Sequence, residues 1–270
     1  MRLDLYLFSH GYAESRQKAK VMIEEGVVFC GGKQLTKASL ETEEGAPIEI
    51  RGEVCPYVGR GGFKLEGALQ AFGVNAGGFS CVDIGSSTGG FTDCLLQHGA
   101  ARVCAVDSGT GQLAEKLRKD NRVDVHEGFN ARNLDTDLTG GPVDLAVCDV
   151  SFISVTYMFE PVLRVLKSYD PETKSGSFLA LIKPQFEAGR ENIGKNGIIR
   201  DERVHLRVTE QVVKRAAAAG LSCLGLAPSP IKGGDGNREF LAHFAKDAEE
   251  YADLRLSDGA YLKELLKEAR

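Results

Sequence analysis

Four charged residues border apolar segments of the sequence, and together they could carry out proton-transfer chemistry. They are Lys64 in GGFKLEGAL, Asp149 in DLAVCDVSF, Lys183 in FLALIKPQF and Glu239 in NREFLAHF. Charged residues at the strand ends of an α/β chain tend to converge on one crevice. Two lysines and two carboxylates in one crevice would form a site that accepts and donates protons. We therefore take these four residues as the candidate catalytic set.

A glycine-rich turn lies in the segment VDIGSSTGGF, which covers residues 82–91 and follows an apolar lead-in. Ser87 stands where a dinucleotide-binding fingerprint has its second glycine, which the backbone needs to approach a pyrophosphate closely. The turn suits S-adenosylmethionine better, because this cofactor carries no phosphate. The alternative is a glycine-rich turn in a Rossmann-like fold that binds another ligand or none.

Two carboxylates are placed to hold such a cofactor. Asp83, at the end of its strand, can bind the methionine ammonium group. Asp107 ends the next strand, in CAVDSG, where a carboxylate can accept hydrogen bonds from both ribose hydroxyls. Gly85, Gly89 and Gly90 allow the chain to pass close to the ligand.

Methyl transfer from a sulfonium to a ribose 2′-hydroxyl requires a group that accepts the hydroxyl proton. Lys183 would be protonated in water, where a lysine has a pKa of ~10.4. Burial beside Lys64 and the sulfonium would lower this pKa and favour a neutral amine base. Asp149 could orient Lys183, and Glu239 could hold Lys64 or the substrate ribose. Taken singly, Lys64 and Glu239 would instead be interpreted as surface charges.

The composition limits the other classes of function. A length of 270 residues with 43% hydrophobic content fits one full α/β domain plus a small module. The seven cysteines follow no CxxC or Cys/His ligand spacing and the five histidines are scattered, so we expect neither a metal site nor disulfides. We find no apolar run of the ~18 residues that a membrane span needs and no signal peptide, and we expect a cytoplasmic protein. The net charge of −5 requires any nucleic-acid contact to be a local patch.

Residues 1–55 are predicted to form a compact unit of two helices and two strands. LDLYLFSHG indicates a short helix, and Ser15 is the expected N-cap of a second helix that runs to about Ile23. VVFC and APIEI indicate the strands. The second helix carries a small basic cluster, which from charge alone would be a solvated helix face. The cluster consists of Arg16, Lys18 and Lys20.

Residues 56–62 are expected to be a linker, because a proline and closely spaced glycines surround this segment. From 63 to 247, near-continuous apolar strands alternate with helical segments, which predicts a doubly wound, largely parallel Rossmann-like sheet. We expect strands in SCVDIG, ARVCAVDSG, VDLAVCDVS, SFLALIKPQ, LSCLGLAPSP and REFLAHF. We expect helices in KLEGALQAFGV, FTDCLLQHG, TGQLAEKLRKD and VTYMFEPVLRVLKSY, and from about 202 to 219. The tail, 248–270, is predicted to end in a short amphipathic helix.

The first 50 residues resemble the S4 RNA-binding domain. The matching features are RLD at the start, SR at the beginning of the second helix, IEEGVVFCGGK, and the closing GAPIEI. The resemblance implies a small α+β domain that docks onto structured RNA through its second helix and the turn after it. The acidic run of Glu41, Glu43 and Glu44 would then face away from the RNA.

The chain as a whole resembles the TlyA family, in which an S4 domain precedes a methyltransferase domain of the FtsJ type. The resemblance rests on GRGGFKLEGAL, VDIGSSTGGFTDCLLQHGA, CDVSFIS, IKPQFEAGRENIGKNGIIRD and SPIKGGDGNREFL. It implies S-adenosylmethionine-dependent methylation of a ribose 2′-hydroxyl of ribosomal RNA, on cytidine, with ribosomal subunits as partners. Cys55-Pro56-Tyr57-Val58 departs from the aromatic-rich tetrapeptide of some members, because it contains no tryptophan.

The resemblance also implies roles for individual residues. The lysine–aspartate–lysine–glutamate set of the family falls on Lys64, Asp149, Lys183 and Glu239. The cofactor contacts fall on Asp83, Gly85, Ser87, Gly89, Phe91, Asp107 and, in GFNAR, Asn130. The RNA contacts are expected from Arg16, Lys18, Lys20 and Arg60.

Three other functions stay open on the sequence alone. A non-catalytic RNA- or ribosome-binding factor would use the S4-like start without the four charged residues. Membrane lysis is suggested by the hemolysin label that members of the family carry, and it is disfavoured because we find no spanning or strongly amphipathic membrane segment. A nicotinamide dehydrogenase is disfavoured by Ser87. The modified nucleotide, the subunit and the oligomeric state cannot be predicted from the sequence.

Overall fold

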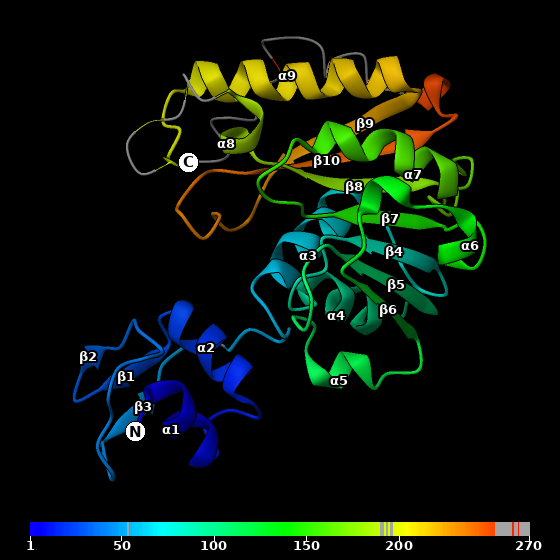
Figure 1. The fold of residues 1–270 in the computed structure, drawn as a ribbon. Helices are drawn as coiled ribbons and strands as arrows, with labels where there is room; N and C mark the ends of the chain where they lie inside the picture. The colour runs from blue at the N-terminus through cyan, green and yellow to red at the C-terminus, as the bar shows by residue number, and fades with distance from the viewer. Residues whose placement is uncertain are drawn as a thin grey trace.

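The computed structural model describes residues 1–52, 54–189, 192, 194, 197–251, 261 and 264. A small N-terminal domain lies beside a larger α/β domain, and one segment of chain joins them (Figure 1). Apart from residues 261 and 264, the helix predicted at the end of the tail lies outside the described residues.

The small domain consists of two helices and a three-stranded antiparallel sheet. The helices are α1 (Leu3–Ser9) and α2 (Arg16–Glu24), and the sheet has the order β2 (Lys33–Gln34), β1 (Val28–Cys30), β3 (Ile48–Ile50). The Ser15 side chain accepts a hydrogen bond from the backbone N–H of Lys18, which confirms the predicted N-cap. Apolar side chains from both helices and the sheet form the core, including Leu3, Leu7, Met22, Ile23 and Val28.

The larger domain is built on a seven-stranded sheet with the order β6-β5-β4-β7-β8-β10-β9. Its strands are β4 (Ser80–Ile84), β5 (Arg102–Asp107), β6 (Val123–Glu127), β7 (Leu145–Cys148), β8 (Ser177–Ile182), β9 (Leu221–Pro228) and β10 (Phe240–Lys246). The five strands from β6 to β8 in this order are parallel, and β10 is antiparallel to both β8 and β9. The predicted doubly wound fold is confirmed, with β10 as a reversed strand in an otherwise parallel sheet.

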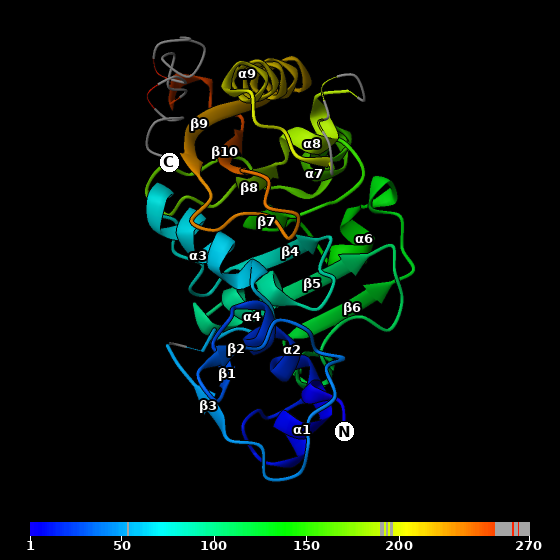
Figure 2. The ribbon, with the colours of Figure 1, turned by 90° about the vertical axis from the view of Figure 1, so that its left-hand side faces the viewer.

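Helices cover both faces of this sheet (Figure 2). One face packs against α3 (Gly61–Phe72), α4 (Gly90–Gln97) and the short α5 (Glu115–Arg118). The other face packs against α7 (Phe159–Val165) and α9 (Glu202–Ala219). Two further short helices are α6 (Thr136–Thr139) and α8 (Pro184–Glu187), and the 3-10 turns are η1 (Ala131–Asn133), η2 (Val155–Met158) and η5 (Glu249–Tyr251).

Two predicted helices are shorter in the structure than the sequence suggested. In TGQLAEKLRKD only α5 is helical, because the carboxylate of Glu127 accepts the backbone N–H groups of Gly111, Gln112 and Leu113 and holds them as a loop. In VTYMFEPVLRVLKSY, η2 is followed by α7, which ends before Leu166 because this residue forms a parallel bridge with Val143.

Two strands and one helix start also differ from the prediction. In the small domain β2 was not predicted, because it has only two residues and both are exposed. Strand β6 was not predicted, because VDVHE alternates apolar and charged residues and lies half-buried at the edge of the sheet. Helix α3 begins at Gly61, inside the segment 56–62 that the sequence suggested as a linker. Gly62 faces Tyr57 so closely that a Cβ atom there would lie 2.2 Å from the ring, and only glycine fits this start of the helix.

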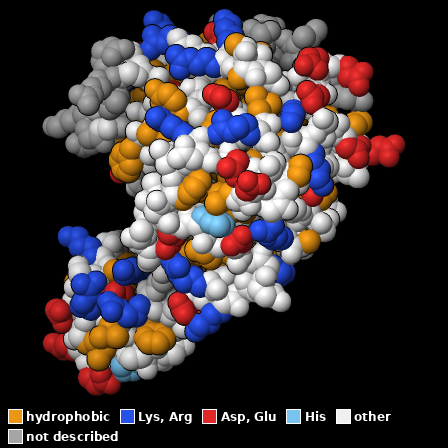
Figure 3. Space-filling model, turned by 45° about the vertical axis from the view of Figure 1, so that its right-hand side comes forward, with side chains coloured by type: hydrophobic (Ala, Val, Ile, Leu, Met, Phe, Trp, Pro, Cys, Tyr) orange, Lys and Arg blue, Asp and Glu red, His pale blue; other side chains and the backbone are white. Residues whose placement is uncertain are grey.

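The surface of the small domain has two differently charged regions. On the face drawn in Figure 3, basic side chains gather over the part that lies toward the larger domain, and acidic side chains lie along the outer edge. This separation allows a local basic patch in a chain whose net charge is −5.

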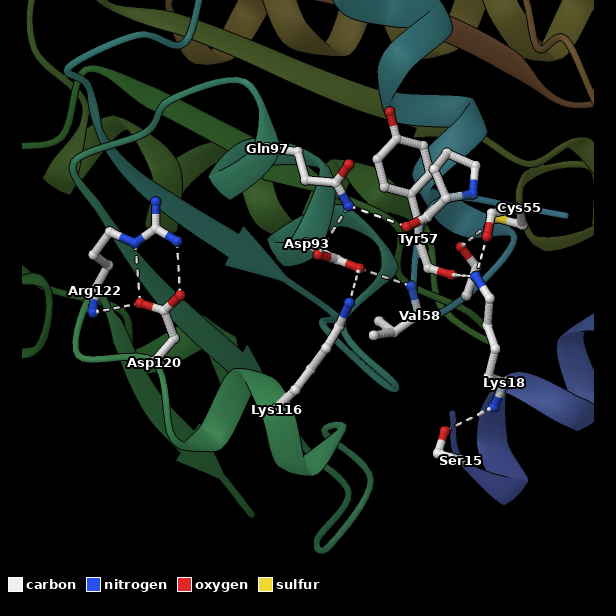
Figure 4. A network of polar contacts seen from close by, with 12 residues as sticks. Ser15, Lys18, Cys55, Tyr57, Val58, Asp93, Gln97, Lys116, Asp120 and Arg122 are labelled. Atoms are coloured by element: carbon white, nitrogen blue, oxygen red, sulfur yellow. Dashed lines mark hydrogen bonds and ion pairs between the residues drawn. The ribbon is translucent and has the colours of Figure 1, made fainter. Parts of the chain in front are cut away.

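The chain between the two domains is packed against the larger one. Cys55, Tyr57 and Val58 are buried in the core under α3 and α4, and the N–H of Val58 donates to Asp93 Oδ2 at 2.8 Å. Lys18 on α2 donates through Nζ to the backbone carbonyls of Cys55 and Tyr57 (Figure 4). Lys18 was predicted to contact RNA, and in the structure its ammonium group is bound at the junction of the two domains.

Among the residues that the structure describes, no helix is both long and apolar enough to cross a lipid bilayer.

Candidate functional site

The four charged residues meet at one edge of the large sheet. Asp149 directly follows β7 and Lys183 directly follows β8, so both stand at the carboxyl ends of adjacent parallel strands. Glu239 precedes β10, whose first residue pairs with Ile182, and the antiparallel direction brings Glu239 to the same edge. Lys64 reaches this edge from the first turn of α3. The topology therefore explains why residues far apart in the sequence converge.

Ion pairs join the four side chains into a chain of alternating charge. Lys64 Nζ lies 2.6 Å from Glu239 Oε2 and 3.5 Å from Asp149 Oδ2. Lys183 Nζ lies 2.6 Å from Asp149 Oδ1 and donates a hydrogen bond to Ser151 Oγ at 2.7 Å. Lys64, Lys183 and Glu239 are more than nine-tenths buried, and all four line a cavity of about 300 Å³.

The surroundings fix the charge state of Lys64. Burial lowers the pKa of Lys64, but the carboxylates of Asp149 and Glu239 outweigh burial and raise this pKa above its usual value. Lys64 is therefore a permanent cation at neutral pH. A buried cation with two carboxylate partners can hold both carboxylates in place and can stabilise negative charge that develops in the cavity.

The glycine-rich turn between β4 and α4 forms one wall of the cavity. Gly85 has φ +84°, and a Cβ atom there would lie 3.0 Å from the backbone oxygen of Asp149. A Cβ atom on Gly90 would lie 3.0 Å from both the oxygen of Gly59 and the nitrogen of Gly62. The glycines thus let the turn approach both the end of β7 and the start of α3.

A second cavity of about 390 Å³ adjoins the first one at the carboxyl ends of β4 and β5. Asp107 ends β5 here, and its carboxylate accepts the N–H of Ser87 at 2.8 Å and the N–H of Gly109 at 2.7 Å. The two cavities have five lining residues in common, namely Gly85, Ser87, Asp149, Ser151 and Phe152. A ligand in the second cavity can therefore present a reactive group to the four charged residues in the first.

The carboxyl group of Asp83 fits a cationic ligand group. Asp83 is fully buried below the turn, and its Oδ2 accepts a hydrogen bond from Thr92 at 2.7 Å. Its Oδ1 has no hydrogen-bond partner among the described residues. Burial raises the pKa of Asp83 to about 7, against the hydrogen bond from Thr92 and with a smaller contribution from the nearby Asp149. An unpaired buried carboxyl oxygen is costly unless a cation or donor satisfies it.

The other predicted cofactor residues fall into two groups. Gly85, Ser87, Asp107 and Asn130 line the second cavity. Phe91 lines the first cavity, and Gly89 turns the chain into α4 with φ +98°, where a Cβ atom would collide with Leu117. The residues that line the second cavity fit S-adenosylmethionine, with Asp107 placed for ribose hydroxyls. Asp83 lines neither cavity and is fully buried below the turn, with one carboxyl oxygen unpaired among the described residues.

The predicted RNA-contact residues lie at three places. Arg60 lines the first cavity. Arg16 donates to the buried carboxylate of Asp4 at 2.9 Å and keeps its side chain half exposed, and Lys20 is exposed on α2. Lys18 is held at the domain junction.

The sequence analysis missed three residues at the mouth of the first cavity, namely Ser151, Phe152 and Phe186. Ser151 accepts the hydrogen bond from Lys183. Phe152 is 88% exposed with φ +67°, and its ring centroid lies 5.3 Å from that of Phe186. Their position directly after two strand ends, in CDVSF and KPQF, is the sequence feature that could have identified them.

Comparison with known proteins identifies families that match most of the chain. The profile of the FtsJ-like methyltransferase family matches residues 57–246, and that of the S4 domain matches residues 1–48. YqxC of Bacillus subtilis is 48% identical over 243 residues, which cover 90% of this chain and 84% of that protein.

Two further relatives cover almost the whole chain. A Mycobacterium tuberculosis protein named 16S/23S rRNA (cytidine-2′-O)-methyltransferase TlyA is 38% identical over 268 residues, 96% of this chain and 98% of that protein. A solved structure of a hemolysin-type protein from Streptococcus thermophilus has a TM-score of 0.77 at 41% identity and covers 99% of this chain and 96% of that one. The chain therefore belongs to the TlyA family, whose members join an S4 domain to an FtsJ-like methyltransferase domain.

Proposed function

We propose that this protein transfers the methyl group of S-adenosylmethionine to a ribose 2′-hydroxyl of ribosomal RNA, on cytidine. The observation that carries the proposal is the pair of adjoining cavities, one suited to the cofactor and the other lined by two lysines and two carboxylates. The name of the Mycobacterium tuberculosis relative supports the choice of RNA, atom and nucleotide. We place the reaction in the cytoplasm, where ribosomal subunits assemble.

Lys183 is the proposed base. S-adenosylmethionine, when bound, would supply an electrophilic methyl group to the hydroxyl oxygen, and S-adenosylhomocysteine would be the leaving group. The hydroxyl proton passes to Lys183 Nζ, so the reaction requires this amine in its neutral form. Asp149 Oδ1, 2.6 Å from Nζ, and Ser151 Oγ, 2.7 Å away, fix the direction in which the amine points.

Lys64 and Glu239 are proposed to prepare the site and to take no proton. Glu239 holds Lys64 at 2.6 Å, and the raised pKa of Lys64 keeps its charge constant. A fixed cation near the attacking oxygen stabilises the negative charge that this oxygen gains as its proton leaves. Lys64 also contacts Asp149 at 3.5 Å and so limits how that carboxylate can move.

Phe152 is proposed to hold the target base. Its ring is 88% exposed and stands on the wall that the two cavities have in common. Enzymes that modify single nucleotides take the target out of its stack and pack the base against aromatic side chains. Phe152 has a left-handed backbone, with φ +67°, and its ring contacts Phe186 while staying 88% exposed, which supports a role in binding.

The test is incubation of the purified protein with methyl-labelled S-adenosylmethionine and purified ribosomal subunits. We expect label in the RNA of at least one subunit. Bound cofactor without any label in RNA would refute the proposal and would favour a non-catalytic RNA-binding factor instead.

A further inference from the structure

The exposed apolar residues of the methyltransferase domain are concentrated in one place. Between residues 57 and 246, the exposed large hydrophobic side chains among those described are Phe152, Ile153 and Tyr157, exposed by 88%, 36% and 55%. They lie within six residues of one another, in the loop after β7 and in η2. A cluster of this kind on an otherwise polar domain marks an interaction surface.

A cation lies on the outermost of these rings. The Arg132 guanidinium carbon is 4.4 Å from the centroid of the Tyr157 ring, which is a cation–π contact. Arg132 is exposed, and among the described residues no carboxylate forms an ion pair with it. Arg132 lies on η1 and Tyr157 on η2. Arg164 on α7 holds η1 in place, because it donates to the carbonyls of Arg132 at 2.5 Å and Leu134 at 3.0 Å.

The Arg132–Tyr157 pair stands at the rim of the second cavity. Ala131 and Met158, the neighbours of the pair in the sequence, both line that cavity together with Phe152 and Ile153. The pair therefore lies beside the part of the second cavity that Phe152 and Ile153 help to line. The pair contributes little to folding, because a cation–π contact at an exposed site is worth only about 0.5–1 kcal/mol.

An exposed aromatic ring with an arginine on it is suited to unpaired RNA. Bases stack on aromatic rings and on guanidinium planes, and the guanidinium also binds the phosphate of the same strand. A protein partner would be expected to cover the apolar residues and leave Arg132 without a counter-charge, whereas RNA satisfies both groups.

We propose that Tyr157 and Arg132 bind a nucleotide that neighbours the methylated one. Its base stacks on the exposed side of the pair, and its phosphate contacts Arg132. The inference rests on the proposed function, since it assumes that the target nucleotide of an RNA strand enters the first cavity past Phe152. The pair would thereby hold the strand on one side of the target while the target ribose faces Lys183.

Steady-state methyl transfer to purified ribosomal subunits tests the inference, together with calorimetric binding of S-adenosylmethionine alone. Removal of one stacked base costs about 1–3 kcal/mol, so Tyr157→Ala should raise KM for the subunits roughly 5- to 150-fold and leave cofactor affinity unchanged. Tyr157→Phe keeps the ring and should behave like the wild type. Arg132→Gln should lower the dependence of subunit affinity on log salt by about 0.7 per lost phosphate contact.

Lys214→Gln is the matched control, since this exposed lysine lies on α9 and pairs with Glu210. If the wild type methylates the subunits and Tyr157→Ala has an unchanged KM, the inference is wrong and the proposed function stands. If Tyr157→Ala weakens cofactor binding instead, the ring contacts the adenine, which also overturns the inference. A wild type that transfers no methyl group overturns the proposed function itself.

Discussion

Replacing Lys64 by methionine removes a buried cation that pairs with two carboxylates, those of Asp149 and Glu239. Replacing Glu239 by leucine removes only one of these two carboxylates. Lys64→Met leaves the Glu239 carboxylate, whose side chain is only 2% exposed, without its partner at 2.6 Å. Loss of one member of a buried ion pair costs about 3–5 kcal/mol. Glu239→Leu leaves Lys64 with Asp149 at 3.5 Å, so we expect a smaller loss of about 1–3 kcal/mol.

The double variant Lys64→Met/Glu239→Leu removes both charges at once. Because hydrophobic replacement of a whole buried pair is often neutral or stabilising, we expect its free energy of unfolding to lie within about 1 kcal/mol of the wild type. The coupling energy between the two sites should therefore be about 3 kcal/mol or more. None of the three variants should transfer methyl groups at the wild-type rate, which separates the stability of the site from its chemistry.

Urea denaturation followed by far-ultraviolet circular dichroism at pH 7.5 measures these differences. A lysine with a raised pKa contributes its full stability below the unfolded pKa of about 10.4 and loses it only as the pH rises through the folded value, so pH 7.5 is suitable. The control is Lys119→Met, because Lys119 forms an exposed pair with Glu115 and should change stability by less than about 0.5 kcal/mol. Additive single effects, or a Lys64→Met variant no less stable than Glu239→Leu, would refute the reasoning.

Three further outcomes are expected. Burial raises the pKa of Asp83 to about 7, so the carboxyl group is mostly protonated at pH 6. If it binds the cofactor ammonium group it must lose this proton, and calorimetry in two buffers should show the release of up to about 0.9 proton on cofactor binding. Asp83→Asn should release none. Lys18→Met frees α2 from the domain junction and should increase the radius of gyration in small-angle X-ray scattering, whereas Lys20→Met should leave it unchanged. Gly85→Ala should lower the melting temperature more than Gly78→Ala, because both have positive φ but only at Gly85 would the added Cβ atom lie 3.0 Å from a backbone oxygen. Equal proton release, scattering or melting in these comparisons would contradict the corresponding assignment.

The convergence of the four charged residues could be predicted from the sequence because three of them adjoin strands. Near-continuous apolar runs mark strands that are buried on both faces, and the carboxyl ends of parallel strands share one edge. Asp149 and Lys183 follow such runs directly. Glu239 reached the same edge only because β10 runs antiparallel to β8, which the sequence pattern did not indicate.

The features that the sequence analysis missed depend on tertiary contacts. Lys18 looked like one of three equivalent basic residues on a helix, and only the packed domain junction distinguishes it from Lys20. The loop before α5 has the composition of a helix, but its backbone N–H groups donate to the carboxylate of Glu127, which lies at the end of β6. Phe152 is exposed and has a positive φ, neither of which is typical of phenylalanine, so the sequence did not indicate either feature.

The central claim is that Lys183 accepts the proton of a ribose 2′-hydroxyl, and single-turnover methyl transfer by Lys183→Met tests it most directly. With cofactor and ribosomal subunits both bound to saturation, we expect the rate to fall by about 10²- to 10⁴-fold, and the remaining wild-type product to be a 2′-O-methylated ribose in nucleoside analysis. A Lys183→Met rate within about threefold of the wild type, or a wild-type product methylated on a base, would contradict the account.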